Sequence, residues 1–169
     1  PDRRADDLFS YFIQDEIDLY CERLFLTVGS KFQHNDYTGF EIQPTARLLW
    51  LPDERHSVWA SVSRAVRTPT RADDGVTITL QNDMGVFPRI SGSRAFEAET
   101  ISAYEAVIRA QTTEKFSWDL ARFYYDYDNR TSQVVGAPEL EFFPPPIPPA
   151  VIVPATLANG GSAQSYGFE

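Results

Sequence analysis

The 169-residue sequence has few residues suited to disulfide bonds or metal binding. It holds one cysteine, Cys21, and two histidines, His34 and His56, which lie far apart in the chain. A single cysteine excludes an internal disulfide, and a zinc site usually takes three or four soft ligands. We therefore expect no metal site and no bound cofactor, and we expect Cys21 to be an inert turn residue.

The sequence also lacks a basic surplus and a long apolar run. Lysine and arginine number 15 against 24 acidic residues, which gives a net charge of −9. This balance argues against a nucleic-acid partner, because such proteins neutralise phosphates with a basic face. No run of about 18 apolar residues occurs, which excludes a membrane-spanning helix. Membrane strands stay open, because each needs only about 9–11 residues of alternating character.

Motifs typical of catalysis are absent as well. No spacing brings a nucleophile, a base and an orienting group together, and no glycine-rich phosphate loop follows a predicted strand. We therefore predict no catalytic residues and no enzymatic activity.

What the sequence contains is alternation of apolar and polar residues, the period of β-strands. In residues 8–19 one face holds Phe9, Tyr11 and Ile13, and Asp15 interrupts it. Comparable segments cover residues 24–33, 40–50, 57–66, 97–111 and 116–127, and another begins at Ser162. We predict an all-β, antiparallel up-and-down meander of about six strands and the start of a seventh. Pro44 lies inside one segment and would remove a ladder donor, so we expect a bulge or a locally broken ladder there.

Two long stretches, residues 67–98 and 130–161, are predicted to be loops. The first is rich in Thr, Asp, Gly and Arg, with a small strand predicted at 76–80. The second holds seven of the twelve prolines, and residues 142–149 predict an extended polyproline-like chain. A docking peptide for a proline-recognising module is one interpretation; we favour a stiff surface loop.

The predicted connections are unequal at the two ends of the meander. Short turns near Cys21, Asp53 and Thr113 share one end, and both long loops lie at the other. Outer-membrane barrels show this asymmetry, with short periplasmic turns and long extracellular loops. The strands also exceed the soluble mode of about five to six residues. These features favour part of a large transmembrane β-barrel over a soluble antiparallel binding module, for example for carbohydrate.

The strand faces of such a barrel divide into an apolar lipid-facing set and a polar lumen-facing set. Arg47, Glu105 and Arg109 fall on the polar set, so we predict that they face the lumen. The alternation does not decide which side of the strand near Trp59 meets lipid. Arg122 interrupts the apolar set, and the sequence gives no reason for it.

Several segments resemble TonB-dependent receptors of the bacterial outer membrane. The sharpest is residues 59–71, WASVSRAVRTPTR, which looks like a barrel motif of that family. Also similar are DLFSYFIQDEI near the start, LTVGSKFQHNDYTGFEIQPTARLLW, AYEAVIRAQTTEKFSWDLARFYYDYDN and the tail NGGSAQSYGFE. The similar segments follow one another in order, with gaps only at the two long loops.

The resemblance implies a barrel of about 22 strands that is plugged by an N-terminal domain. Such receptors import scarce ligands, typically ferric siderophores or cobalamin, with energy delivered through TonB. We expect residues 1–169 to be an internal part of the barrel domain, since the chain starts at Pro1 without an initiator methionine. The plug and the TonB-contacting segment would lie upstream. The implied partners are outer-membrane lipid, TonB and a small-molecule ligand such as an iron chelate; another barrel such as a porin is the alternative.

The first long loop holds four arginines in an otherwise acidic chain: Arg67, Arg71, Arg89 and Arg94. They would attract an anionic iron chelate by steering and bidentate contacts, which makes them our candidate ligand-binding residues. The alternative, which we favour, is that they pair with lipopolysaccharide phosphates or with acidic neighbours. These neighbours are Asp73, Asp74, Asp83, Glu97 and Glu99.

Overall fold

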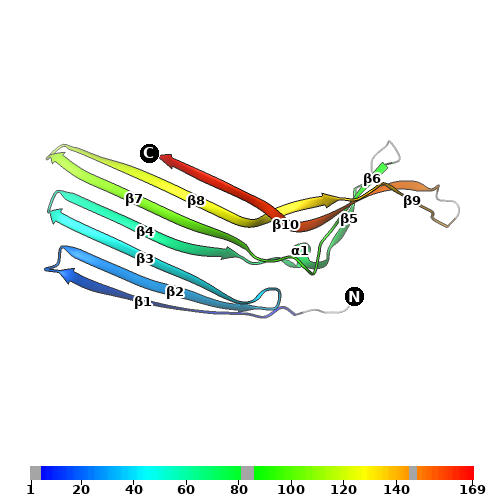
Figure 1. The fold of residues 1–169 in the computed structure, drawn as a ribbon, viewed down its shortest axis with the longest axis horizontal. Coiled ribbons are helices and arrows are strands. Elements are labelled where there is room, and N and C mark those ends of the chain that lie inside the picture. Colours follow the sequence, from blue (N-terminus) through cyan, green and yellow to red (C-terminus); the bar gives the residue numbers. More distant parts are fainter. Residues whose placement is uncertain (1–4, 81–85, 145–147) are drawn as a thin grey trace.

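The computed structural model describes residues 5–80, 86–144 and 148–169. Within them, ten strands form one curved sheet (Figure 1). The long strands are β1 (Leu8–Tyr20), β2 (Leu24–Asn35), β3 (Gly39–Asp53), β4 (His56–Arg67), β7 (Glu99–Thr113), β8 (Phe116–Val135) and β10 (Ala150–Phe168). The short elements are α1 (Arg71–Gly75), β5 (Thr77–Thr79), β6 (Val86–Ser91) and β9 (Glu139–Glu141). The predicted all-β meander is confirmed, with ten strands in place of six or seven.

The long strands pair antiparallel in the order β1-β2-β3-β4-β7-β8-β10, which continues to β6 and β5. Their turns at residues 21–23, 54–55 and 114–115 lie together at one end of the sheet, and the longer connections lie at the other (Figure 1). The predicted asymmetry is therefore confirmed. Cys21 lies in the first turn with Glu22, at φ 43° and 57°, and is exposed. Such a pair of positive φ angles is typical of a hairpin turn of type I′.

The prediction that residues 130–161 form a loop is wrong for most of that stretch. Strand β8 runs to Val135, and β10 begins at Ala150 rather than at Ser162. The first half of β10 pairs with β6 and with β9, and Ile152 is buried. Residues 150–158, AVIVPATLA, are almost all apolar on both faces of the strand, so no period of two marks this part of β10 in the sequence.

The first long stretch is also more ordered than a loop. The strand predicted at residues 76–80 is confirmed as β5, and β6 pairs in parallel with β10 over Val86 to Ser91. Helix α1 begins after Thr70, whose side chain and that of Asp73 form a capping box. The polyproline prediction for residues 142–149 falls partly on residues 145–147, outside the described residues.

Pro44 breaks one ladder and not the other. The register between β2 and β3 runs continuously through Pro44, so the predicted bulge is wrong. The ladder between β3 and β4 begins only at Thr45, as expected next to a residue without an N–H group. Beyond it, side chains replace the missing bonds: Arg64 donates to the carbonyl oxygen of Ile42 at 2.6 Å, and Gln43 Oε1 accepts from the backbone nitrogen of Val66 at 3.3 Å.

The register defines the two faces of the sheet, because residues paired across strands point to the same side. One row of the polar face contains Glu16, Thr27, Arg47, Ser61, Glu105 and Phe123. A row of the apolar face contains Val28, Ala46, Val62, Tyr104, Tyr124 and Tyr166. Trp59 lies on the polar face, because it is paired with Leu49. Leu49 is two residues after Arg47 in β3 and therefore points to the same side. The residues of its strand on the apolar face are Val58, Ala60 and Val62.

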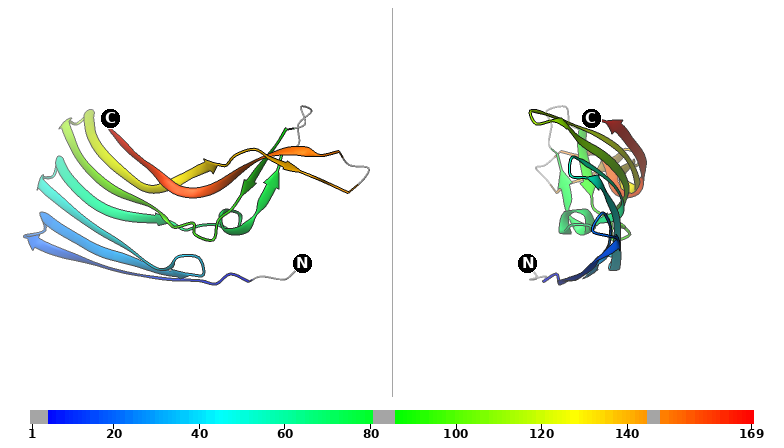
Figure 2. Two further views of the ribbon diagram at one scale, coloured as in Figure 1. Left: turned by 45° about the vertical axis from the view of Figure 1, so that its right-hand side comes forward. Right: turned by 90° about the vertical axis from the view of Figure 1, so that its left-hand side faces the viewer.

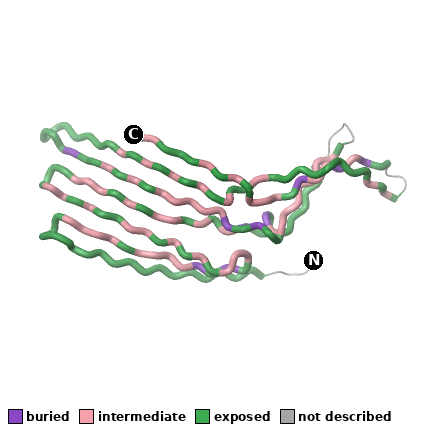
Figure 3. Tube along the Cα trace, viewed as in Figure 1, coloured by how far each residue is buried: buried purple, intermediate pink, exposed green. Residues whose placement is uncertain are grey.

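Burial of the two faces is inverted relative to a soluble protein. Glu41, Gln43 and Glu105 on the polar face are half-buried, whereas Trp50 and Tyr104 on the apolar face are 50% and 49% exposed. The alternation is visible along the strands, and the sheet curves across its width (Figures 2 and 3). Large apolar side chains are normally inside a soluble fold. A soluble sandwich would bury these apolar residues against a second sheet, and the described residues contain a single one.

Candidate functional site at the loop end of the sheet

The four candidate arginines lie at the end of the sheet that carries the long connections. Arg67 ends β4, Arg71 opens α1, Arg89 lies in β6, and Arg94 lies between β6 and β7. Ion pairs hold the first three. Among the described residues, Arg94 has neither an ion pair nor a hydrogen bond, and it is exposed.

The partners of the three paired arginines are only partly those expected. Arg67 pairs with Glu99 at 2.9 Å and lies 3.6 Å from Asp73, as the sequence indicated. The other two pair with distant acids: Arg71 lies 2.5 Å from Asp6, and Arg89 lies 2.5 Å from Glu141. Asp83, another expected partner, lies outside the described residues. The hypothesis that these arginines pair with acidic neighbours therefore holds for Arg67, whose partners Glu99 and Asp73 were both expected.

Glu99 joins three elements at this end. Its carboxylate accepts hydrogen bonds from the backbone nitrogen of Thr131 at 2.7 Å and from the Thr131 hydroxyl, in addition to the pair with Arg67. Burial raises the pKa of Glu99, but the hydrogen bonds from Thr131 and the charge of Arg67 outweigh burial and hold this pKa below its ordinary value. The carboxylate thus connects β4, β7 and β8 in its charged form.

A second network fixes the segment that precedes β7. Asn159 Oδ1 accepts from the backbone nitrogen of Glu97 at 2.6 Å, and Asn159 Nδ2 donates to the carbonyl oxygens of Glu97 and Asn129 at 3.0 and 2.7 Å. Asn129 has a φ of 53°, and the β8–β10 register shifts beside it. Sequence reasoning missed this site, although Asn residues beside Gly160 and Gly161 are a signal of irregular backbone.

A polar pocket of about 500 Å³ lies between the β2–β3 hairpin and residues 94–98. Its lining residues are Tyr37, Thr38, Glu41, Arg64, residues 94–98, Thr100 and Asn129. The volume falls within the range of about 300–1,000 Å³ of small-molecule sites. Arg64 is already held by Ile42 and lies 3.9 Å from Glu41, so Arg94 is the cation in the wall of this pocket that has no partner among the described residues.

The three predicted lumen residues all lie on the polar face, and each has a partner. The Arg47 guanidinium lies 4.5 Å from the centre of the Trp59 ring. Glu105 accepts a 2.6 Å hydrogen bond from the Tyr125 hydroxyl, and Arg109 lies 3.2 Å from Asp119. These contacts join neighbouring strands.

Among the described residues, no group of three or more His, Cys, Asp or Glu side chains lies close enough to hold a metal ion. No helix in the same part of the chain has the length and apolarity to cross a membrane.

A single-layer, curved antiparallel sheet with an exposed apolar face and a polar face defines a class: the wall of a large β-barrel. A profile of the family described as "TonB dependent receptor-like, beta-barrel" matches residues 1–169. The chain therefore belongs to the TonB-dependent receptor β-barrel family, as its sequence resemblance indicated.

Solved structures agree on the fold. The siderophore receptor PirA from Acinetobacter baumannii matches with a TM-score of 0.75 at 14% identity, over 96% of this chain and 25% of its own. PirA from Pseudomonas aeruginosa matches at 0.76 and 19%, over 97% and 30%. A mutant ferric enterobactin receptor, PfeA, from Pseudomonas aeruginosa in complex with enterobactin matches at 0.76 and 23%, over 97% and 24%. The chain thus spans 24–30% of the length of these receptors. No curated protein matches it.

Proposed function

We propose that this chain is part of the outer-membrane barrel wall of a receptor that imports a scarce small-molecule ligand, with energy delivered through TonB. The inverted burial of the two faces carries the proposal. In a bilayer the apolar face meets acyl chains, and the polar face lines the interior, where a plug domain or water satisfies it. A soluble binding module does not explain a sheet that leaves large apolar side chains of one face exposed, among them Trp50, Tyr104 and Trp118.

The slope of the apolar band supports this location. On β8 the band ends towards the loops at Tyr124, because Asp126 follows on the same face. The register places Tyr124 level with Asp15 in β1, which lies five strands away across the sheet. On β1 the apolar face continues towards the loops for six more residues, to Phe9. With about 3.3 Å per residue and about 4.8 Å between strands, this shift corresponds to a strand tilt of about 40°. Membrane barrels have tilts of about 35–45°.

The polar pocket at the loop end is our candidate contact site for the ligand. Arg94, a cation with no ion pair to the part of the chain that the structure describes, suits an anionic iron chelate, and the phenol of Tyr37 lines the same pocket. The solved neighbours are siderophore receptors, one of them bound to enterobactin, which supports an iron chelate over cobalamin. Arg67, Arg71 and Arg89 serve mainly to hold the surrounding segments, because acidic residues already neutralise them.

The experiment uses the full-length receptor with ferric enterobactin as the probe. We expect Arg94→Ala to weaken binding about tenfold, the effect of losing one charge-assisted contact. The matched control is Arg130→Ala, which removes a cation from the same end of the sheet but outside the pocket. Uptake of radioactive iron should depend on TonB in wild-type cells. TonB-independent uptake would contradict the proposed function, and no binding of ferric enterobactin would contradict this chelate as the ligand.

A further inference from the structure

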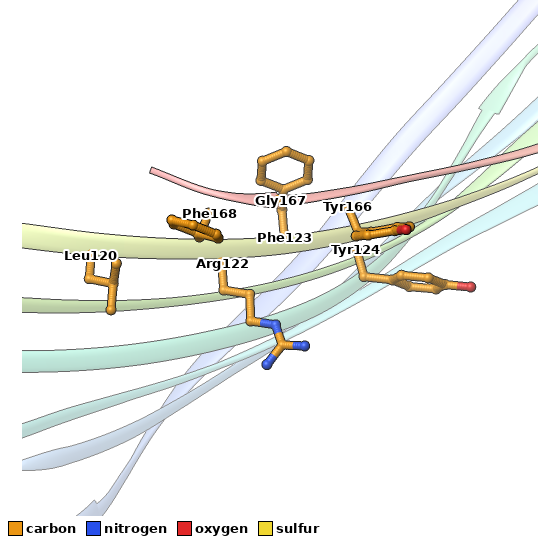
Figure 4. A pocket seen from close by; sticks show the side chains of 7 residues that line it. All are labelled: Leu120, Arg122, Phe123, Tyr124, Tyr166, Gly167 and Phe168. Carbon is orange, nitrogen blue, oxygen red and sulfur yellow. The ribbon is translucent and has the colours of Figure 1, made fainter.

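Arg122 is a charged residue on the exposed apolar face, one position on that face before Tyr124, where the apolar band of β8 ends. Its register neighbours on that face are Ala106 in β7 and Phe168 in β10, and Leu120 and Tyr124 flank it along β8. Figure 4 shows Arg122 on the side of β8 opposite to the ring of Phe123. None of the described residues gives Arg122 an ion pair or a hydrogen bond.

A row of three tyrosines lies one step from Arg122 towards the loops. Tyr104, Tyr124 and Tyr166 are paired across β7, β8 and β10, and the first two rings lie 6.1 Å apart. They are 49%, 37% and 77% exposed, and their hydroxyls have no partner among the described residues. Phenols at the edge of an apolar band lie at the level of lipid headgroups. A long arginine side chain two residues below extends to the same level while its stem stays among apolar groups.

The chemistry of this cluster suits a lipid phosphate. A guanidinium and phenol hydroxyls together donate several hydrogen bonds to phosphate oxygens. Beside them Leu120 and Phe168 keep the surface of this face apolar (Figure 4). Asp126, the next residue on this face beyond Tyr124, repels anions and so limits a phosphate to the level of the tyrosines.

We propose that Arg122 and the row of Tyr104, Tyr124 and Tyr166 bind the phosphate of a phosphorylated lipid in the leaflet on the loop side. In the outer membrane this lipid is lipopolysaccharide, whose acyl chains would lie against the apolar face below the tyrosines. The inference rests on the proposed membrane location. It gives Arg122 a ligand in place of an uncompensated charge facing hydrocarbon.

The test uses the full-length receptor in nanodiscs of phosphatidylcholine. Lipopolysaccharide is titrated in, and the bound molecules are counted by native mass spectrometry. We expect Arg122→Ala and Arg122→Leu to lower the affinity about tenfold and Arg122→Lys to lower it less, because lysine keeps the charge but loses the planar donors. Lys115→Ala, which removes a cation from the turn at the opposite end of β8, is the matched control and should leave binding unchanged.

Three outcomes would overturn the proposal. Equal affinity of Arg122→Ala and the wild type excludes Arg122, and equal binding of dephosphorylated lipopolysaccharide excludes the phosphate. Competition by millimolar inorganic phosphate would assign the cluster to a free anion instead of a lipid. A wild-type receptor that does not insert into nanodiscs would refute the membrane location itself, whereas an inserted receptor with an unaffected variant refutes only the lipid site.

Discussion

Replacing Glu99 by alanine should loosen the loop end of the sheet without unfolding the barrel. In the structure its carboxylate accepts both the backbone N–H and the hydroxyl of Thr131 and pairs with Arg67. The alanine variant removes all three contacts at once. It also separates the start of β7 from β8 and from the segment that carries α1.

The magnitude follows from the exposure of the partners. Hydrogen bonds to a charged group contribute about 1.5–3 kcal/mol when buried. The Glu99 side chain is 21% exposed, but that of Arg67 is 52% exposed, so their ion pair adds at most about 1 kcal/mol. Water will also reach the exposed Thr131 N–H in the variant. We therefore expect a loss of about 2 kcal/mol in local stability, which is about a thirtyfold rise in the opening equilibrium.

Hydrogen exchange of the Thr131 amide in the full-length receptor measures this opening directly. The control is Glu139→Gln, which removes an acidic charge from the exposed start of β9. Exchange within twofold of wild type in Glu99→Ala would refute the reasoning. The pH dependence of the protection of the Thr131 amide is a second test. Since the pKa of Glu99 lies below its ordinary value of 4.5, the protection is complete above that pH and is lost as the pH falls through the lowered pKa.

Two further predictions test the packing and the orientation of the sheet. Gly29→Ala should lower the unfolding free energy, measured by urea denaturation, by about 1–3 kcal/mol, because the new Cβ would lie 2.9 Å from the backbone oxygen of Ile13. The control is Gly75→Ala, where the space is open. Equal urea midpoints of the two variants would contradict this prediction. In single-tryptophan variants of the receptor, brominated lipid should quench the fluorescence of Trp50 and Trp118 but leave Trp59 nearly unchanged. Strong quenching of Trp59 would reverse the assignment of the faces.

The long strands could be predicted because their alternation is local. Residues 8–19, 40–50 and 97–111 each show a period of two, and the structure has strands there whose ends lie within three residues of the predicted ones. The face of Arg47 was predictable for the same reason. The first half of β10 was not, because its residues are apolar at successive positions and show no alternation.

The candidate site was less accessible to prediction. The sequence indicated which residues are cationic, but not that Arg71 and Arg89 pair with Asp6 and Glu141, which are far from them in the chain. It also gave no sign that Arg94 would line a pocket together with the β2–β3 hairpin. These contacts depend on how the long connections fold over the end of the sheet.

The sequence by itself determined that this protein is a meander of long strands with one polar and one apolar face, because strand periodicity and turn residues act over a few positions. The tertiary structure alone decided the register. Register places Trp59 beside Arg47 and puts Arg122 below a row of tyrosines. Such pairings join residues distant in the chain, and a shift of one residue would move every side chain to the opposite face.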